Sequence, residues 1–165
     1  MTEAEIIHWF SLAWPGPLMR GTDWQFGFSE TLHFMGLCLL FGALIVVDVR
    51  LLGFFKELPV KAVLPFIQFA IIGFLINLAT GWSFFTSNPS LYWGNPAFRM
   101  KLLLILLAGI NALVFTVVEH RRVALLPPGE DTPALTKITA ALSLSLWTGV
   151  LVFGRLLPIF TLSVN

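Results

Sequence analysis

The 165-residue chain is too apolar for a water-soluble globular domain. Hydrophobic residues make up 57% of it and charged residues 12%, and its mean hydropathy is +0.86. The formal net charge of +1 creates no broad field for nucleic acid or acidic substrates, so we expect no nucleic-acid partner. Cys38 is the only cysteine, which excludes a disulfide or a thiolate metal cluster within one chain.

The first element expected is a short helix over residues 3–14. It places four large apolar side chains on one face: Ile6, Ile7, Phe10 and Trp14. This pattern is typical of a helix that lies in the membrane interface. Pro15, Gly16 and Pro17 follow and end it.

Four long apolar runs follow the interfacial helix. A helix of ~20 apolar residues spans the ~30 Å hydrocarbon core of a bilayer. Charged and turn-forming residues between the runs predict four spans, at residues 24–47, 62–86, 97–118 and 133–162. We therefore expect an all-α membrane protein, residues 1–165 forming one four-helix transmembrane bundle with the lipid bilayer as its first partner.

The distribution of basic residues predicts the orientation in the membrane. The side reached after the first span carries six of them: Arg50, Lys56, Lys61, Arg121, Arg122 and Lys137. The opposite side has only Arg20, Arg99 and Lys101. Because basic loops stay in the cytoplasm, both termini are expected outside it.

Ionisable side chains inside the spans are the candidate site. A charge at the bilayer centre costs about 2.5–3.5 kcal/mol on insertion scales, so each such residue calls for a partner or a function. The candidates lie in the outer half of the predicted bundle: Glu30, His33, Trp82, Lys101 and Arg155. They come from all four spans, and we expect them to meet in one layer.

Glu30 and His33 are three residues apart and share a helix face. This Glu-x-x-His spacing occurs in carboxylate-bridged metal sites of helix bundles, which need two copies and further glutamates. One copy per chain would leave such a site incomplete. A metal ion on Glu30 and His33 would need a smaller ligand set or ligands from other protomers, which favours a homo-oligomer.

His33 has three interpretations. It is an axial ligand of haem b, with Arg155 or Lys101 pairing with the propionates; it shares a transition metal ion with Glu30; or it belongs to a satisfied polar cluster that binds no cofactor and orients the helices. A second haem histidine is hard to supply. His8 would reach the site only if the interfacial helix folded over the bundle mouth, and His120 lies at the opposite end of the third span.

Two stretches resemble an uncharacterised family of bacterial four-helix inner-membrane proteins. They are ETLHFMGLCLLFGALIVVDVRLLG, residues 30–53, and SNPSLYWGNPAFRMKLLLILLAGINALVF, residues 87–115. The resemblance implies a bacterial inner-membrane location and the four-span topology, and implies no settled activity. It draws attention to eight residues in its motifs: Glu30, His33, Asp48, Arg50, Asn95, Pro96, Lys101 and Asn111.

Our leading functional hypothesis is a membrane redox protein that binds haem or a metal at His33 and passes electrons to a partner. The alternative is a protein that binds or transports an ion, a proton or a small solute through the same outer polar cluster. A structural accessory subunit of a membrane complex is the third hypothesis. No reaction is assigned from the sequence.

Overall fold

The computed structural model describes residues 2–21 and 23–162. Over this part of the chain the regular secondary structure is entirely helical, and four helices are long and apolar enough to cross a membrane. Their ranges are Trp24–Leu51, Val60–Ser87, Pro96–Val123 and Ala134–Phe160. The predicted fold class, a four-helix membrane bundle with a short N-terminal helix, is confirmed.

The helical elements run in chain order as follows: α1 Glu3–Leu12, α2 Gly16–Met19, α3 Asp23–Leu51, α4 Val60–Val63, α5 Phe66–Ser87, α6 Pro89–Trp93, α7 Pro96–Val114, the π-helical η1 Phe115–Glu119, α8 His120–Val123 and α9 Ala134–Leu162. Helix α3 extends four residues beyond the predicted span 24–47, and the third spanning helix continues five residues beyond 97–118. Both predictions stopped at a carboxylate, Asp48 or Glu119, which the structure buries inside the bundle.

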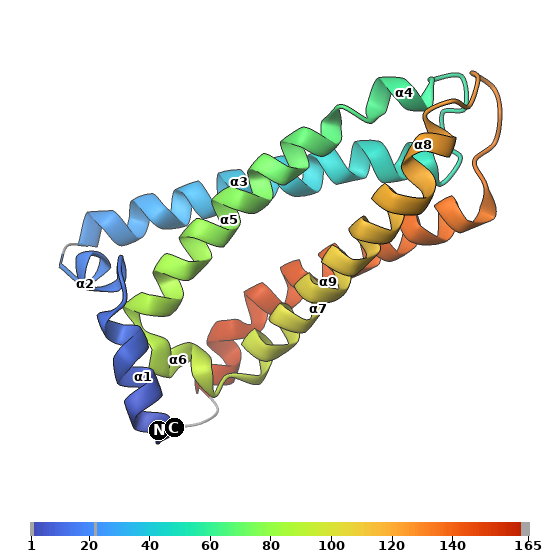
Figure 1. The fold of residues 1–165 in the computed structure, drawn as a ribbon. Coiled ribbons are helices and arrows are strands. Elements are labelled where there is room, and N and C mark those ends of the chain that lie inside the picture. The colour runs from blue at the N-terminus through green and yellow to red at the C-terminus, as the bar shows by residue number, and fades with distance from the viewer. Residues whose placement is uncertain (1, 22, 163–165) are drawn as a thin grey trace.

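The spanning helices form two hairpins, α3 with α5 and α7 with α9, which meet chiefly through α3 and α9 (Figure 1). We call the end that carries α1, α2 and α6 the terminal end, and the end that carries residues 52–59 and 124–133 the loop end. Within the first hairpin the backbones nearly touch, because a Cβ added at Gly73 would lie 2.5 Å from the Gly36 carbonyl oxygen. Glycine at this crossing therefore sets the hairpin's separation.

The main apolar core lies at the loop end, where all four spanning helices contribute. Its buried members are Val47, Leu51, Val60, Val63, Leu64, Val123 and Ala140. A smaller apolar layer near mid-bundle joins Leu40, Ala43 and Ala70, with Phe74 and Trp147 packed against it. The larger of the two buried apolar clusters is thus at the loop end.

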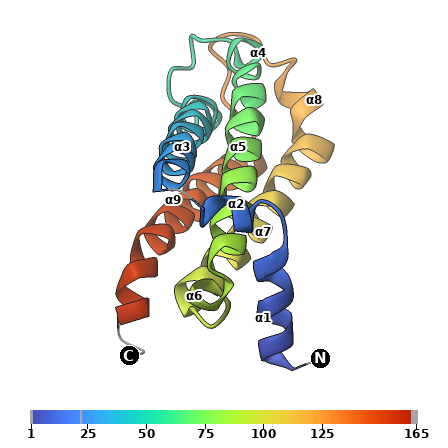
Figure 2. The same ribbon diagram turned by 90° about the vertical axis from the view of Figure 1, so that its left-hand side faces the viewer.

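The N-terminal segment closes over the terminal ends of α5 and α6 (Figure 2). Arg20 donates hydrogen bonds to the carbonyl oxygens of Thr86 at 3.0 Å, Ser87 at 3.1 Å and Ser11 at 2.6 Å. Phe10 of α1 contacts three rings from α5 and α6: Trp82, Phe85 and Trp93. The guanidinium and the aromatic contacts together hold α1 against the bundle.

Candidate functional site

His33 of α3 lies half-buried against α5. Its Nδ1 is 2.7 Å from Thr80 Oγ1, and its ring packs on Phe84 with the ring centroids 5.4 Å apart. Thr80 in turn donates to the Ile76 carbonyl oxygen at 2.7 Å. A threonine hydroxyl has one proton, and that proton is directed at Ile76. Nδ1 of His33 must therefore be the donor to Thr80, which leaves Nε2 of the neutral ring with its lone pair.

The other predicted outer residues do not gather round this imidazole. Glu30 and Arg155 are exposed, and neither makes a hydrogen bond or ion pair within residues 2–21 and 23–162. Lys101 is half-buried between α7 and α9, where a Cβ added at Gly154 would lie 3.6 Å from its Nζ. Lys101 is also close enough to act electrostatically on His33. Of the five predicted outer residues, only His33 and Lys101 are half-buried, His33 in the first hairpin and Lys101 in the second.

Trp82 and His8 lie elsewhere at the terminal end. Residues two apart on a helix point to nearly opposite sides, so Trp82 faces away from the side on which Thr80 meets His33. The indole Nε1 donates to the Trp14 carbonyl oxygen at 3.0 Å, which ties α5 to the N-terminal segment. His8 is exposed on α1. Within the described residues, no three or more histidine, cysteine, aspartate or glutamate side chains converge as a metal site.

A second polar group, which we call the loop-end polar layer, lies between α3, the π-helical end of α7, and α9. It consists of Asp48, Asn111, Glu119, Thr136, Thr139 and Ser143. Asp48 is 5% exposed and Glu119 only 1%. Both carboxylates are therefore removed from solvent inside helices that cross the membrane.

Asp48 meets α9 at Ser143, whose hydroxyl group lies close enough to interact with the Asp48 carboxyl group. Its second carboxylate oxygen, Oδ2, is buried and has no hydrogen-bond partner among the residues that the structure describes. A buried charged or polar group without a partner costs free energy, so an unpaired oxygen marks a position kept for a ligand, a water or a proton. This oxygen is the clearest unsatisfied acceptor of the loop-end polar layer.

Glu119 meets α9 about two turns closer to the loop end, at Thr136. Thr136 donates its hydroxyl proton to Glu119 Oε2. Asn111, which precedes Glu119 in the third span, donates to the Thr139 carbonyl oxygen at 2.9 Å. The two side chains of α7 and η1 thus bind successive turns of the same face of α9.

Arg50, also at the loop end, binds backbone carbonyl oxygens of the loop that follows α3. Its Nε donates to the Leu58 carbonyl oxygen at 2.6 Å and its Nη2 to the Lys56 carbonyl oxygen at 3.2 Å, while Nη1 is buried without a partner. The guanidinium folds residues 52–59 back over the end of α3. Asp48 and Arg50 therefore act on different partners, although they are close in sequence.

The sequence contained a signal for the loop-end polar layer that the prediction did not use. Three hydroxyl residues of α9 recur at helical spacing and are all buried: Thr136, Thr139 and Ser143. Spacings of three and four residues place them on one face. The π-helical turn, in contrast, has no recognisable pattern in a single sequence. Because three basic residues follow Glu119, the sequence predicts that the helix ends there.

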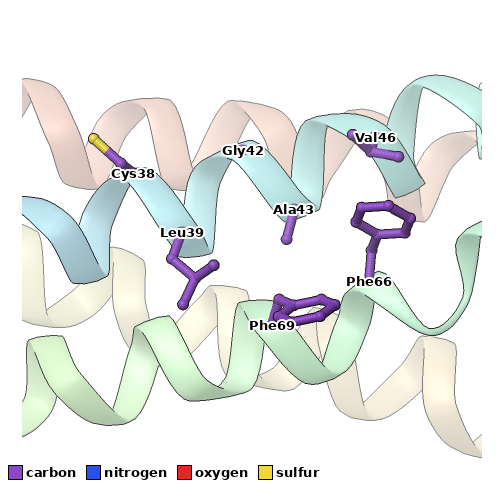
Figure 3. Close-up of a pocket in the computed structure, with 7 residues that line it drawn as sticks. All are labelled: Cys38, Leu39, Gly42, Ala43, Val46, Phe66 and Phe69. Carbon is purple, nitrogen blue, oxygen red and sulfur yellow. The ribbon is translucent and has the colours of Figure 1, made fainter.

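A shallow apolar groove of about 430 Å³ opens between α3 and α5 (Figure 3). Its walls are formed by Cys38, Leu39, Gly42, Ala43, Val46, Phe66 and Phe69. None of these side chains is charged or a strong hydrogen-bonding group. The groove therefore matches hydrocarbon and offers nothing that would orient a polar substrate.

The chain matches no family model, no curated protein and no solved structure with which it was compared. The resemblance carried by residues 30–53 and 87–115 stays a prediction. Asn95, one of the residues to which it draws attention, has a clear local role. It caps α7 by accepting from the amides of Ala97 and Phe98, and it donates to the Leu157 carbonyl oxygen of α9 at 3.1 Å.

Proposed function

We propose that this multi-pass membrane protein binds protons and moves them across the bilayer, with Asp48 as the buried proton carrier. The observation that supports this most is the unpartnered Oδ2 of Asp48, held beside Ser143 in a spanning helix. Ionisable residues that face the interior of a transmembrane bundle commonly mark ion pathways and proton relays. A carboxyl group can take up a proton at this position without any other ligand.

The position of His33 supports the same function. His33 and Asp48 both lie on α3, fifteen residues and therefore ~22 Å apart at ~1.5 Å per residue. Between them lies the apolar layer formed by Leu40, Ala43 and their neighbours. The two halves of the bundle thus each contain a titratable side chain of α3, His33 or Asp48, and the apolar layer separates them, as a proton-moving protein requires to avoid leakage.

Proteoliposomes loaded with a pH-sensitive dye test the proposal. A pH jump outside vesicles of wild-type protein should change the internal pH faster than in protein-free vesicles, and Asp48→Asn should remove the difference. Asp131→Asn is the matched control, because Asp131 lies in the exposed loop 124–133. Equal rates in wild-type, Asp48→Asn and empty vesicles would refute a proton-moving function.

A cofactor at His33 is the second candidate, and one observation favours it. Metal-binding histidines usually donate their second ring nitrogen to a neighbouring acceptor, which fixes the ring and its tautomer. Thr80 holds Nδ1 of His33 in this manner and leaves Nε2 free. Haem b or a transition metal ion would bind there and supply one-electron chemistry, with an electron-transfer partner outside this chain.

The absorption spectrum and metal content of detergent-purified protein test the cofactor hypothesis. A Soret band or a stoichiometric metal that disappears in His33→Ala would support it. A preparation that moves protons but contains neither haem nor metal, even after supplementation of the growth medium, would exclude the cofactor hypothesis. Proton movement would then be the remaining function.

We also propose a bacterial inner-membrane location with the loop end in the cytoplasm, supported by the basic residues there. A second copy of the chain is the proposed partner. Glu30 and Arg155 carry opposite charges, are both exposed, and lie on α3 and α9, which share one side of the molecule (Figure 2). Each would find its counter-ion on the other protomer, which also fits an isologous dimer.

A further inference from the structure

The π-helical segment η1 interrupts an otherwise regular helix within the third span. A regular α-helix turns about 100° per residue, so eight residues would place Glu119 about 80° away from the face of Asn111. A π turn holds one more residue per turn and brings Glu119 back to within about 20° of that face. Both side chains do reach α9, Asn111 at Thr139 and Glu119 at Thr136. The extra residue therefore aims a carboxylate into the bundle.

This arrangement has a cost that a purely structural role would not explain. A regular helix at this point would rotate Glu119 about 80° away from the face that meets α9. Instead the carboxylate is 1% exposed, and Thr136 is its sole hydrogen-bond partner within the described residues. Single π turns occur frequently at functional sites.

Glu119 and Asp48 are joined by the hydroxyl face of α9. Thr136 binds Glu119, Ser143 lies beside Asp48, and Thr139 lies between them with its side chain buried. Seven residues separate the two ends of this face, which is ~10 Å at ~1.5 Å per residue. Thr139 donates its own proton to the Thr136 carbonyl oxygen at 2.9 Å. The hydroxyl therefore presents only acceptor positions, and a proton would need water to pass it.

We infer that Glu119 is the loop-end proton donor and acceptor that exchanges protons with Asp48 along the hydroxyl face of α9. This inference rests on the proposed proton function. In the exchange, the Glu119 carboxyl group releases a proton, hydroxyl groups and water pass it along, and Asp48 Oδ2 receives it. The carboxyl of Glu119 becomes a carboxylate and the carboxylate of Asp48 becomes a carboxyl, so total charge is unchanged.

The charged surroundings fit an entry point. His120, Arg121 and Arg122 follow Glu119 directly at the membrane boundary, and the latter two are exposed. Across the layer, α3 contributes Asp48, while Arg50 is engaged with the carbonyl oxygens of Lys56 and Leu58. α9 faces Glu119 with the hydroxyl group of Thr136, and the adjacent Lys137 is engaged with Asp131 at 2.8 Å. Protons arriving at the loop end thus meet Glu119 before Asp48.

The Glu119→Gln variant tests the inference in the same proteoliposomes. Glutamine keeps the length of the side chain and can accept from Thr136, but it cannot carry a proton. Loss of a positioned proton donor should slow proton entry by about tenfold or more. The buried carboxyl of Asp48 should still respond to pH in infrared difference spectra, where Asp48→Asn identifies its signal.

Three further variants keep the test decisive. Thr136→Val removes the hydroxyl without changing shape and should slow the flux, whereas Thr116→Val, whose exposed hydroxyl bonds its own helix, should not. Deleting Val117, which is 73% exposed within η1, converts the π turn to a regular turn while Glu119 keeps its face, so flux should persist. Wild-type flux in folded Glu119→Gln or Thr136→Val, with flux abolished by Asp48→Asn, would overturn this inference alone. An unaffected Asp48→Asn would overturn the proposed function as well.

Discussion

Thr80 accepts a hydrogen bond from His33 Nδ1 at 2.7 Å while its own hydroxyl proton is bound to the Ile76 carbonyl oxygen. The backbone of α5 thus determines the tautomer of a side chain on α3. A histidine fixed in this way has one defined reactive nitrogen, Nε2. Both candidate functions use that nitrogen, either as a proton acceptor or as a ligand.

The first prediction is that Thr80→Val releases this constraint. Valine has the same shape but cannot accept from Nδ1, so His33 should lose a hydrogen bond of about 1 kcal/mol and populate both tautomers. The ¹⁵N chemical shifts of the imidazole, measured by NMR on ¹⁵N-histidine-labelled protein, report which nitrogen carries the proton. Thr148→Val is the control, since the Thr148 hydroxyl bonds only its own helix, at Leu144. An Nε2-protonated wild-type ring would contradict the assignment.

The second prediction concerns the crossing of α3 and α5. Gly73→Ala places a Cβ 2.5 Å from both the Gly36 carbonyl oxygen and the Leu40 amide nitrogen, so the two backbones must separate. We expect a loss of about 1–3 kcal/mol of stability, seen as a lower thermal midpoint of helicity in detergent. Gly109→Ala is the matched control, because nothing lies within 4 Å of its added Cβ. Alanine there should be neutral or stabilise by up to about 1 kcal/mol. Equal midpoints for the two variants would refute the close crossing.

The third prediction is a pH dependence at the loop end. Hydrogen bonds from Lys137, at 2.8 Å, and Lys56, at 3.2 Å, hold the pKa of Asp131 at about 2, below its ordinary 3.8. The folded state therefore favours the carboxylate. Its stabilising contribution is complete above a pH of about 4 and is lost as the pH falls towards about 2.

Asp131→Asn should lower the thermal midpoint at pH 6, and its difference from wild type should shrink as the pH falls through this window. Glu130→Gln provides the control, since the Glu130 side chain makes no ion pair within the described part of the chain. A pH-independent difference between Asp131→Asn and wild type would mean that the Lys56 and Lys137 contacts add nothing in solution. Asp131 is exposed, so the effect should also weaken at high salt.

The fold was predictable because each spanning helix is one long apolar run. A run of about 20 such residues crosses the hydrocarbon core as a helix. The helix ends were less predictable. Asp48 and Glu119 were placed at boundaries because sequence alone cannot distinguish an interfacial carboxylate from one buried against a neighbouring helix. The π turn that turns Glu119 inwards depends on packing against α9, which no local pattern encodes.

The candidate site was predicted only in part for a related reason. Depth along a span can be counted from the sequence, and His33 and Lys101 do lie in the same half of the bundle. The direction of each side chain depends on how the helices are rotated, which depth does not give. Glu30 and Trp82 consequently lie near the level of His33, but Glu30 is exposed and Trp82 is bound to the Trp14 carbonyl oxygen of the N-terminal segment.

The final prediction tests the proposed second copy through Glu30 and Arg155. Glu30 lies six residues from Trp24 and Arg155 five from Phe160, so both are ~8–9 Å inside their spans at ~1.5 Å per residue. Glu30→Arg and Arg155→Glu should each weaken self-association, measured by subunit counting in vesicles, because like charges then meet at the interface. The double exchange should restore it.

Cysteine cross-linking distinguishes a pair between protomers from one within a chain. In a Cys38→Ala background, one tagged copy carries Glu30→Cys and a second copy carries Arg155→Cys, and the two are co-expressed. Oxidation should join the differently tagged chains, since neither copy alone contains both thiols. Replacing Glu30→Cys by Glu57→Cys, in the exposed loop 52–59, should abolish the cross-link. If the double charge exchange restores the wild-type behaviour but no cross-link forms between the differently tagged chains, the ion pair lies inside one protomer. That result would refute the proposed dimer.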